Sequence, residues 1–237
     1  MPDTILLTGA SGFIAKHCAL ALLNAGYAVR GTVRRLDRGA EVQAAVAPHL
    51  DDRAALDRLS FVAADLTSDA GWPEAMAGVA AVMHTASPFP ISEPKDEADL
   101  IRPAVEGTAR VLNAAADAGV GRIVLTSSVV AIADLRRKRV QTAEDWADPE
   151  APGASAYGKS KTLAEREAWA IAGARGLALT TVNPAFVLGP PLDAQFGSSV
   201  GVIRRFLAGK DPAMPRVGFP VVDVRDVAAL HLRALQR

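Results

Sequence analysis

Hydrophobic residues along this chain fall into short apolar runs separated by longer amphipathic segments. The segment 13–25 places Ile14, Cys18 and Leu22 on one helical stripe, and the segments 104–119 and 157–176 also have the period of a helix. Strands that alternate with helices are typical of βαβ units. The pattern therefore predicts an α/β fold, a Rossmann-type doubly wound parallel sheet, with strands in the apolar runs 4–8, 27–33, 59–65, 79–86, 122–128 and 178–184.

Glycine and proline mark the expected ends of these helices. Gly26 stops the first helix, Pro103 lies near the start of the second, and Gly119 lies just beyond its end. After residue 183 the chain becomes rich in proline and irregular. We therefore expect a sheet-forming region over residues 1–183 and a looser region over residues 184–237 that is interleaved with it.

Composition narrows the range of partners. The 237 residues contain 26 Lys and Arg against 26 Asp and Glu, so there is no basic footprint for nucleic acid or for an anionic membrane. The single cysteine, Cys18, excludes an intramolecular disulfide and suits a reducing compartment. The N-terminus lacks a basic signal region, and charges interrupt the apolar runs. We expect a cytoplasmic monomer or homodimer whose partner is a small molecule, with no nucleic acid and no membrane.

The stretch TILLTGASGFIA places Gly9, Gly12 and Ala15 between the first predicted strand and the first helix. Small residues at this spacing let the backbone turn sharply, approach a pyrophosphate and pack the helix on the sheet. A plain strand-to-helix turn would have the same spacing, but the strand before it and the helix after it favour dinucleotide binding. The residues expected to touch the cofactor here are Thr8, Gly9, Ser11, Gly12, Phe13 and Ile14.

The second predicted strand ends in GTVRRLDR, about twenty residues beyond the glycine turn. Dinucleotide folds that prefer NAD usually carry an acid there, whereas an arginine accommodates the 2′-phosphate of NADP. Arg34 occupies the acid's place, with Arg35 and Arg38 behind it. A solvated loop of arginines is the alternative. The position favours NADPH or NADP as cofactor, held by Arg34 and Arg38.

Two polar motifs supply candidate chemistry. The fifth strand ends in LTSS, which offers Ser127 and Ser128, and strand geometry alone does not choose between them. In YGKSK, Tyr157 and Lys161 are four residues apart and so share one helix face. An ammonium beside a phenol lowers the tyrosine's pKa, which makes a usable proton donor and acceptor.

The motifs TGASGFIA, ADL, HTASPF, VEGT, LTSS, YGKSK and NPAFVLGP together resemble the extended short-chain dehydrogenase/reductase family, within the NAD-dependent epimerase/dehydratase superfamily. HTASPF and GTVR are most similar to its dihydroflavonol 4-reductase-like branch of aldehyde and ketone reductases. The resemblance implies an NADP-dependent oxidoreductase with catalytic Ser128, Tyr157 and Lys161, where Tyr157 and Lys161 also contact the cofactor. It further implies cofactor contacts from Asp65, Leu66, Thr85, Ala86, Ser87, Pro184, Val187 and Ser199.

Two other functions share these motifs: a sugar-nucleotide epimerase or dehydratase, and a non-catalytic dinucleotide-binding redox sensor. Arg34 and HTASPF weigh against the epimerase, and the complete triad weighs against the sensor. Family members continue into a C-terminal region that closes over the substrate, whereas this chain ends at VDVRDVAALHLRALQR. We therefore expect either that the substrate-binding region is truncated or that this sequence is a fragment of a longer chain.

The remaining candidates have simpler interpretations. His84 ends a strand and is expected to be a packed neighbour rather than a base, and Cys18 is expected in the core. Asn113 either supports the lysine, as asparagine does in related enzymes, or is an exposed amide. The acidic run 142–150 is expected to be a solvated loop, with a place at the rim of the substrate entrance as the alternative. No cluster has the spacing of metal ligands.

Overall fold

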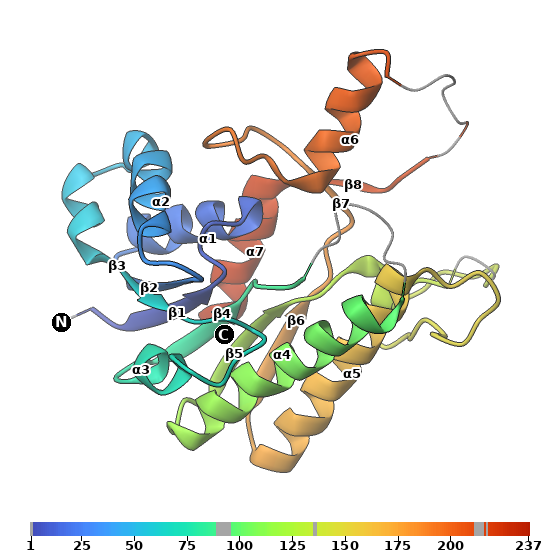
Figure 1. Cartoon of the computed structure of the whole chain (residues 1–237), viewed down its shortest axis with the longest axis horizontal. Helices are drawn as coiled ribbons and strands as arrows, with labels where there is room; N and C mark the ends of the chain where they lie inside the picture. Colours follow the sequence, from blue (N-terminus) through green and yellow to red (C-terminus); the bar gives the residue numbers. More distant parts are fainter. Residues whose placement is uncertain (1, 89–95, 135–136, 211–215, 217) are drawn as a thin grey trace.

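A computed structural model of the chain describes residues 2–88, 96–134, 137–210, 216 and 218–237 (Figure 1). Six parallel strands form the main sheet, and a further pair forms a small second sheet. The main strands are β1 (Thr4–Thr8), β2 (Ala28–Val33), β3 (Leu59–Ala63), β4 (Ala81–His84), β5 (Arg122–Thr126) and β6 (Ala178–Val182). The helices are α1 (Phe13–Asn24), α2 (Arg38–Val46), α3 (Trp72–Met76), α4 (Ala98–Asp117), α5 (Ala156–Arg175), α6 (Gly197–Leu207) and α7 (Val224–Leu235), with short 3-10 turns at Ala47–His49, Arg53–Arg58 and Val129–Ala131.

The strand order in the main sheet is β3-β2-β1-β4-β5-β6, so the predicted doubly wound fold is confirmed. The chain builds outward from β1 to β3 and then crosses back to place β4 on the other side of β1. Ligands of open α/β sheets bind in the crevice beyond the carboxyl ends of the strands at such a reversal. In register, Thr8 at the end of β1 lies beside His84 at the end of β4. The glycine turn and the motif after β4 therefore meet at this crevice.

Alternate side chains of the strands enter two separate cores. Ile5 and Leu7 of β1 pack with α1, α2 and α7, whereas Leu6 packs on the opposite face with α3, α4 and α5. Figure 1 shows the second group of helices in front of the sheet and the first group behind it. Strands buried on both faces explain why the sequence shows continuous apolar runs rather than alternation.

Helix α4 begins at Ala98, several residues before the start predicted from the position of Pro103. Pro103 lies inside the helix, in its second turn. A proline at this position lacks the N–H that would donate to the preceding turn, so α4 has one backbone hydrogen bond fewer there. The bond from the N–H of Ile101 to the carbonyl of Glu97 holds the turn before it.

The last quarter of the chain packs in two different places. Strands β7 (Phe186–Leu188) and β8 (Val221–Asp223) form the second, parallel sheet, and α6 stands away from the main sheet in Figure 1. Helix α7 instead returns to the main sheet and packs against α1, and its His231 bonds to Thr126 of β5 through Nε2 (2.6 Å). Residues after 183 thus contribute both to the second sheet and, through α7, to the packing of the main sheet. Within the described ranges, none of the helices combines the length and the apolar character needed to cross a bilayer.

Candidate active site

The glycine turn forms a close-fitting bend at the head of α1. Gly9 has a φ of +66°, and a Cβ built there would lie 3.0 Å from Cα of Ala86. The N–H of Gly12 donates to the carbonyl of Gly9 (2.9 Å), and α1 begins at Phe13 without any side-chain cap. A Cβ at Gly9 would collide with Ala86, and one at Gly12 would lie 3.2 Å from the carbonyl oxygen of Gly9, so neither position has room for a larger side chain. The free N–H groups and the positive dipole end of α1 therefore face an open cradle that suits a phosphate.

Thr8 connects this turn to the strand beside it. Its hydroxyl oxygen accepts hydrogen bonds from the backbone N–H groups of Thr85 (3.1 Å) and Ala86 (3.0 Å). These two bonds use both lone pairs, so the hydroxyl proton is donated to Nδ1 of His84 (2.7 Å), and Nε2 of the imidazole carries the ring proton. Burial, with a smaller contribution from the Lys161 charge, lowers the pKa of His84 to about 3. As expected, His84 is a packed, neutral side chain.

The arginines after β2 differ in their partners. Arg35 forms an ion pair with Asp37, and Arg38 pairs with Glu41 (2.8 Å) while donating to the amide oxygen of Gln195 (3.1 Å). Arg34 is exposed and has no ion pair among the residues described. Its guanidinium is thus available to an anion at the end of β2.

Asp65 and Leu66 follow β3 at the same edge of the sheet. The Asp65 carboxylate accepts from the backbone N–H and the hydroxyl of Thr67, and these bonds, with a weaker contribution from the Arg34 charge, lower its pKa. Leu66 lies under α4, where a Cβ at Gly107 would come within 2.8 Å of the leucine Cβ. Asp65 therefore lies within the electrostatic range of Arg34, and Leu66 packs against α4.

Ser128, Tyr157 and Lys161 converge from two elements. Ser128 follows β5, and its hydroxyl accepts from the N–H of Val130 (3.4 Å) and hydrogen bonds with the Tyr157 hydroxyl. Tyr157 lies in the first turn of α5, which Ser155 caps by accepting from the N–H of Gly158 (3.1 Å). Lys161 lies one turn further on, with Nζ 5.9 Å from the centre of the Tyr157 ring. Nδ2 of Asn183 donates to the Ser128 carbonyl (3.2 Å) and fixes the backbone there.

The two titratable members have shifted pKa values. Burial lowers the pKa of Lys161 to about 8, although the Glu165 carboxylate opposes the shift. Burial also raises the pKa of Tyr157, and the hydrogen bond with Ser128 only partly offsets this effect. The lowering of the tyrosine's pKa expected from the Tyr-x-x-x-Lys spacing is therefore not present in this state. The reason is burial: desolvation disfavours both phenolate and ammonium.

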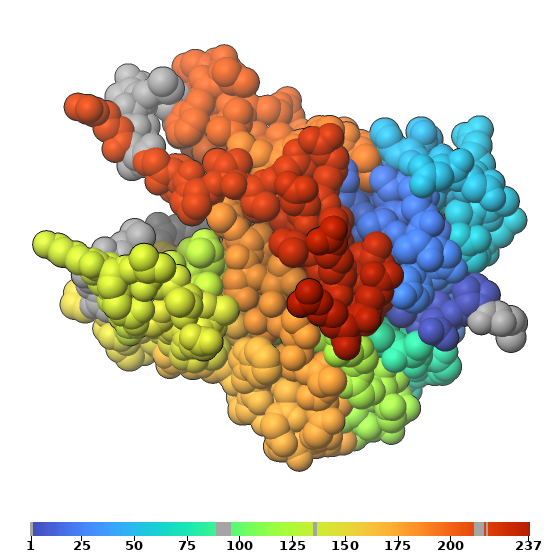
Figure 2. Space-filling model, turned by 180° about the vertical axis from the view of Figure 1, so that it is seen from behind, coloured from blue at the N-terminus to red at the C-terminus, as the bar shows by residue number. Residues whose placement is uncertain are grey.

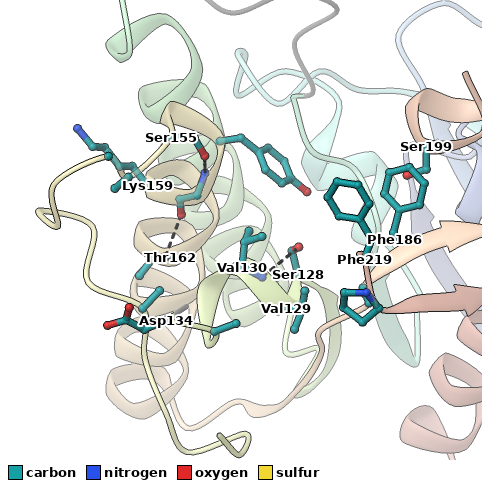
Figure 3. A pocket seen from close by; sticks show the side chains of 18 of the residues that line it. Ser128, Val129, Val130, Asp134, Ser155, Lys159, Thr162, Phe186, Ser199 and Phe219 are labelled. Atoms are coloured by element: carbon teal, nitrogen blue, oxygen red, sulfur yellow. Dashed lines mark hydrogen bonds between the residues drawn. The ribbon is translucent and has the colours of Figure 1, made fainter. Parts of the chain in front are cut away.

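Two adjoining cavities meet at these residues. The smaller, about 280 Å³, is lined by the glycine turn, by Lys161 and by the segment after β6. The larger, about 1140 Å³, has a mostly apolar lining. Phe186, Phe219 and Ser128 are among the residues that line it (Figure 3). The rings of the two phenylalanines are stacked, with their centres 5.3 Å apart. Ser128 and Tyr157 line both cavities, so their hydroxyls stand at the junction.

In the space-filling view, the orange and red segments of α6 and β8 and the yellow-green segment that follows β5 flank a hollow on one side of the molecule (Figure 2). The larger cavity is lined from the same segments, which contribute Val130, Val202 and Phe219. It is therefore open to molecules of moderate size.

A family model described as "NAD dependent epimerase/dehydratase family" matches residues 5–237. The chain belongs to this family. It is 36% identical over 241 residues to cinnamoyl-CoA reductase CAD2 of Medicago truncatula, and the aligned region covers 99% of this chain and 72% of that protein. It is 35% identical over 216 residues to dihydroflavonol 4-reductase of Zea mays, and the aligned region covers 88% of this chain and 59% of that protein. The yeast methylglyoxal/isovaleraldehyde reductase Gre2, solved with NADPH, superimposes with a TM-score of 0.86 at 28% identity, over 99% of this chain and 74% of that one.

The structure brings most of the predicted site residues together around the smaller cavity. The smaller cavity is lined by Gly9, Gly12, Phe13, Ile14, Thr85, Ser87, Ser128, Tyr157, Lys161, Pro184, Val187 and Ser199. Thr8 and Ala86 lie directly behind it in the hydrogen bonds described above. Ser11, Arg34, Arg38, Asp65 and Leu66 are not among its lining residues.

Three further findings concern residues that the sequence left open or missed. The amide oxygen of Asn113 accepts from Arg175 (3.3 Å), the last residue of α5. Lys161 lies near the start of the same helix, so Asn113 does not support it. Glu165 and Asn183 stand beside the triad although neither was predicted; the only signal was that Glu165 follows Lys161 by one helical turn. Among the described residues, no group of three or more His, Cys, Asp or Glu side chains could hold a metal ion.

Proposed function

We propose that the chain binds NADPH and reduces the carbonyl group of a small aldehyde or ketone. The observation that carries this proposal is the position of Ser128 and Tyr157, whose side chains line both the cavity at the glycine turn and the larger apolar cavity. A cofactor in the first cavity and a carbonyl compound in the second would meet at these hydroxyls. Residues 1–183 then supply most of the cofactor site, and residues 184–237 supply much of the substrate wall.

Named residues fit each portion of the cofactor. The helix start at Phe13 and the close-fitting Gly9 and Gly12 suit the pyrophosphate. Arg34 suits the 2′-phosphate as a planar, bidentate donor, with Arg38 beside it. Lys161 lines the smaller cavity and suits a ribose hydroxyl. NADPH, when bound, supplies the hydride that reduces the carbonyl carbon.

The chain's own groups supply the proton and the orientation. Ser128 donates to the carbonyl oxygen and holds it beside Tyr157. The Tyr157 hydroxyl gives its proton to that oxygen as the alcohol forms. The raised pKa keeps the tyrosine protonated before the reaction, and the Lys161 ammonium stabilises the phenolate that remains. One hydride and one proton convert the carbonyl to an alcohol.

The apolar lining of the larger cavity favours a carbonyl compound over a sugar nucleotide. Val129, Val130, Phe186 and Phe219 give this cavity an apolar wall, whereas a sugar or a second diphosphate needs polar and cationic partners. Among the residues described, the lining contains two cations, Arg205 and Lys159, and Lys159 forms an ion pair with Glu97 (2.7 Å). Arg34 also stands where an enzyme that prefers NAD would carry an acid. These observations support a reductase rather than an epimerase.

Tyr157→Phe tests this function in the whole chain. Its ring is preserved, so NADPH should bind within about twofold of wild type, while reduction of aldehydes and ketones should fall at least about 10²-fold because the proton donor is lost. NADPH fluorescence titration and consumption of NADPH with a carbonyl panel measure the two effects. Near-normal turnover by Tyr157→Phe would contradict the mechanism. A wild-type chain that binds NADPH but reduces nothing in the panel would instead indicate a dinucleotide-binding sensor.

A further inference from the structure

Glu165 is a buried carboxylate beside the proposed active site. It is only 3% exposed, although it carries a charge-bearing side chain on a surface-facing helix. Such groups are almost never fully buried without specific partners. Glu165 lies one turn beyond Lys161 on α5, so the two side chains emerge on the same face of the helix.

The carboxylate has a defined set of partners. One oxygen accepts from Nδ2 of Asn183 (2.7 Å), and the other accepts from the indole N–H of Trp169 (3.4 Å). The same Asn183 nitrogen donates to the backbone carbonyl of Ser128 (3.2 Å). A continuous connection therefore runs from Glu165 through Asn183 to the backbone of Ser128, while the carboxylate also acts on the Lys161 ammonium.

We propose that Glu165 is a positioning residue, which acts through its charge on Lys161 and through Asn183 on Ser128 so that the two sides of the site keep their alignment. This inference rests on the proposed function. Ser128 lies in the segment after β5 and Lys161 lies on α5, and the Asn183 link supplies a polar tie between that segment and the helix. Glu165 itself touches neither cavity.

The charge component of the role follows from the surroundings of Lys161. The titratable groups that act on Lys161 are Glu165 and Tyr157 on its own helix and His84 on β4. His84 is neutral and Tyr157 is protonated, so Glu165 is the single negative charge among these three. Burial disfavours the ammonium, and Glu165 counteracts that effect. Without Glu165, Lys161 should lose its proton at lower pH.

Glu165→Gln tests the charge directly, because it keeps the shape and an acceptor oxygen for Asn183. The measurement is an NMR pH titration of the Lys161 Cε resonance in the full chain with labelled lysine, and the resonance is assigned from its loss in Lys161→Arg. In Glu165→Gln the midpoint of this titration should lie about 1 pH unit lower than in wild type. The alkaline limb of the reduction rate with NADPH should move in the same direction. Glu167→Gln, two residues along the same helix and outside this network, is the matched control and should leave both midpoints unchanged. Glu165→Asp retains the charge and should return the Lys161 midpoint toward the wild-type value.

The Asn183 link has its own variant. Asn183→Ala should lower kcat about tenfold, since Ser128 loses its anchor, while the Kd for NADPH stays within about twofold. An unchanged Lys161 midpoint in a folded Glu165→Gln variant would overturn the inference, as would an unchanged kcat in Asn183→Ala if Glu165→Gln does not fold. A wild-type chain without reductase activity would refute the proposed function, but the lysine titration would still decide the charge role of Glu165.

Discussion

Arg34 is the residue whose role separates two cofactors. Its guanidinium is exposed, whereas its neighbours Arg35 and Arg38 are paired with Asp37 and Glu41. A charge-assisted, bidentate contact with a 2′-phosphate is worth about 1.5–3 kcal/mol, or roughly ten- to a hundredfold in affinity. We therefore expect Arg34→Ala to weaken NADPH by that factor and to spare NADH, as measured by fluorescence titration of both cofactors. Arg35→Ala is the control. Equal losses for NADPH and NADH in Arg34→Ala would remove the assignment.

His84 should make the stability of the fold depend on pH. Its pKa is about 3 in the folded chain and about 6.5 when unfolded, so between these values the unfolded chain binds more protons. The stability that the neutral imidazole provides is complete above about pH 6.5 and is lost as pH falls toward 3. From pH 7 to pH 5 the loss should be about 2 kcal/mol.

The variant that isolates this effect is His84→Gln, which cannot titrate. It should be less stable than wild type at pH 7, because a flexible amide replaces the buried ring that packs there and accepts from the Thr8 hydroxyl. The gap between the two proteins should narrow by about 2 kcal/mol as pH falls to 5. Urea unfolding at pH 7, 6 and 5 measures it. Parallel curves over this range would show that His84 is not held neutral.

At the scale of single residues, the sequence predicts which side chains could react, but not how deeply each of them is buried. The spacing of Tyr157 and Lys161 places both on one helix face, and the structure agrees. The same spacing suggested a lowered tyrosine pKa, and that was wrong for this state because the burial of the phenol depends on residues distant in the chain. Glu165 was missed for the same reason: its partner Asn183 comes from the end of β6.

The first turn of α5 carries Tyr157, so its cap should influence both stability and catalysis. The Ser155 hydroxyl satisfies one of the free N–H groups of that turn, that of Gly158. Ser155→Ala should therefore cost about 1 kcal/mol and should lower turnover, because a frayed turn holds the tyrosine less firmly. Ser155→Asp keeps an acceptor and should retain most of the stability. Urea unfolding of the three proteins gives the comparison, and equal loss in both variants would show that the cap is not the cause.

Among the elements, those with strong local signals were predicted and those that depend on partners were not. All six strands of the main sheet were expected, within a few residues at their ends, because continuous apolar runs separated by glycine-terminated helices are a local feature. Strands β7 and β8 have three residues each and exist only because they pair with one another across a long gap in the chain. The start of α4 lies several residues before the one that the sequence predicts, because Pro103 lies inside the helix rather than at its boundary.

Across the whole molecule, a buried ion pair connects the first helix to the segment before α6. The Lys16 ammonium on α1 bonds the Asp193 carboxylate, which is 177 residues away in sequence. The side chain of Lys16 is 3% exposed and that of Asp193 is 25% exposed. Next to this pair, Nε2 of His17 bonds the carbonyl of Pro190 (3.0 Å). These contacts hold the segment between β7 and α6 against α1.

The unequal burial of the two charges predicts unequal costs of removing them. Asp193→Asn leaves a buried ammonium without its counter-charge, which should cost about 3–5 kcal/mol. Lys16→Met leaves a carboxylate that water can reach, and its apolar chain fills the same space, so the loss should be smaller. The double variant Lys16→Met with Asp193→Leu removes both charges and should recover much of the stability lost in Asp193→Asn. Urea unfolding of the wild type and the three variants tests this order. If Lys16→Met proved the more damaging single change, the larger cost would lie in the unpaired Asp193 carboxylate rather than in the buried ammonium.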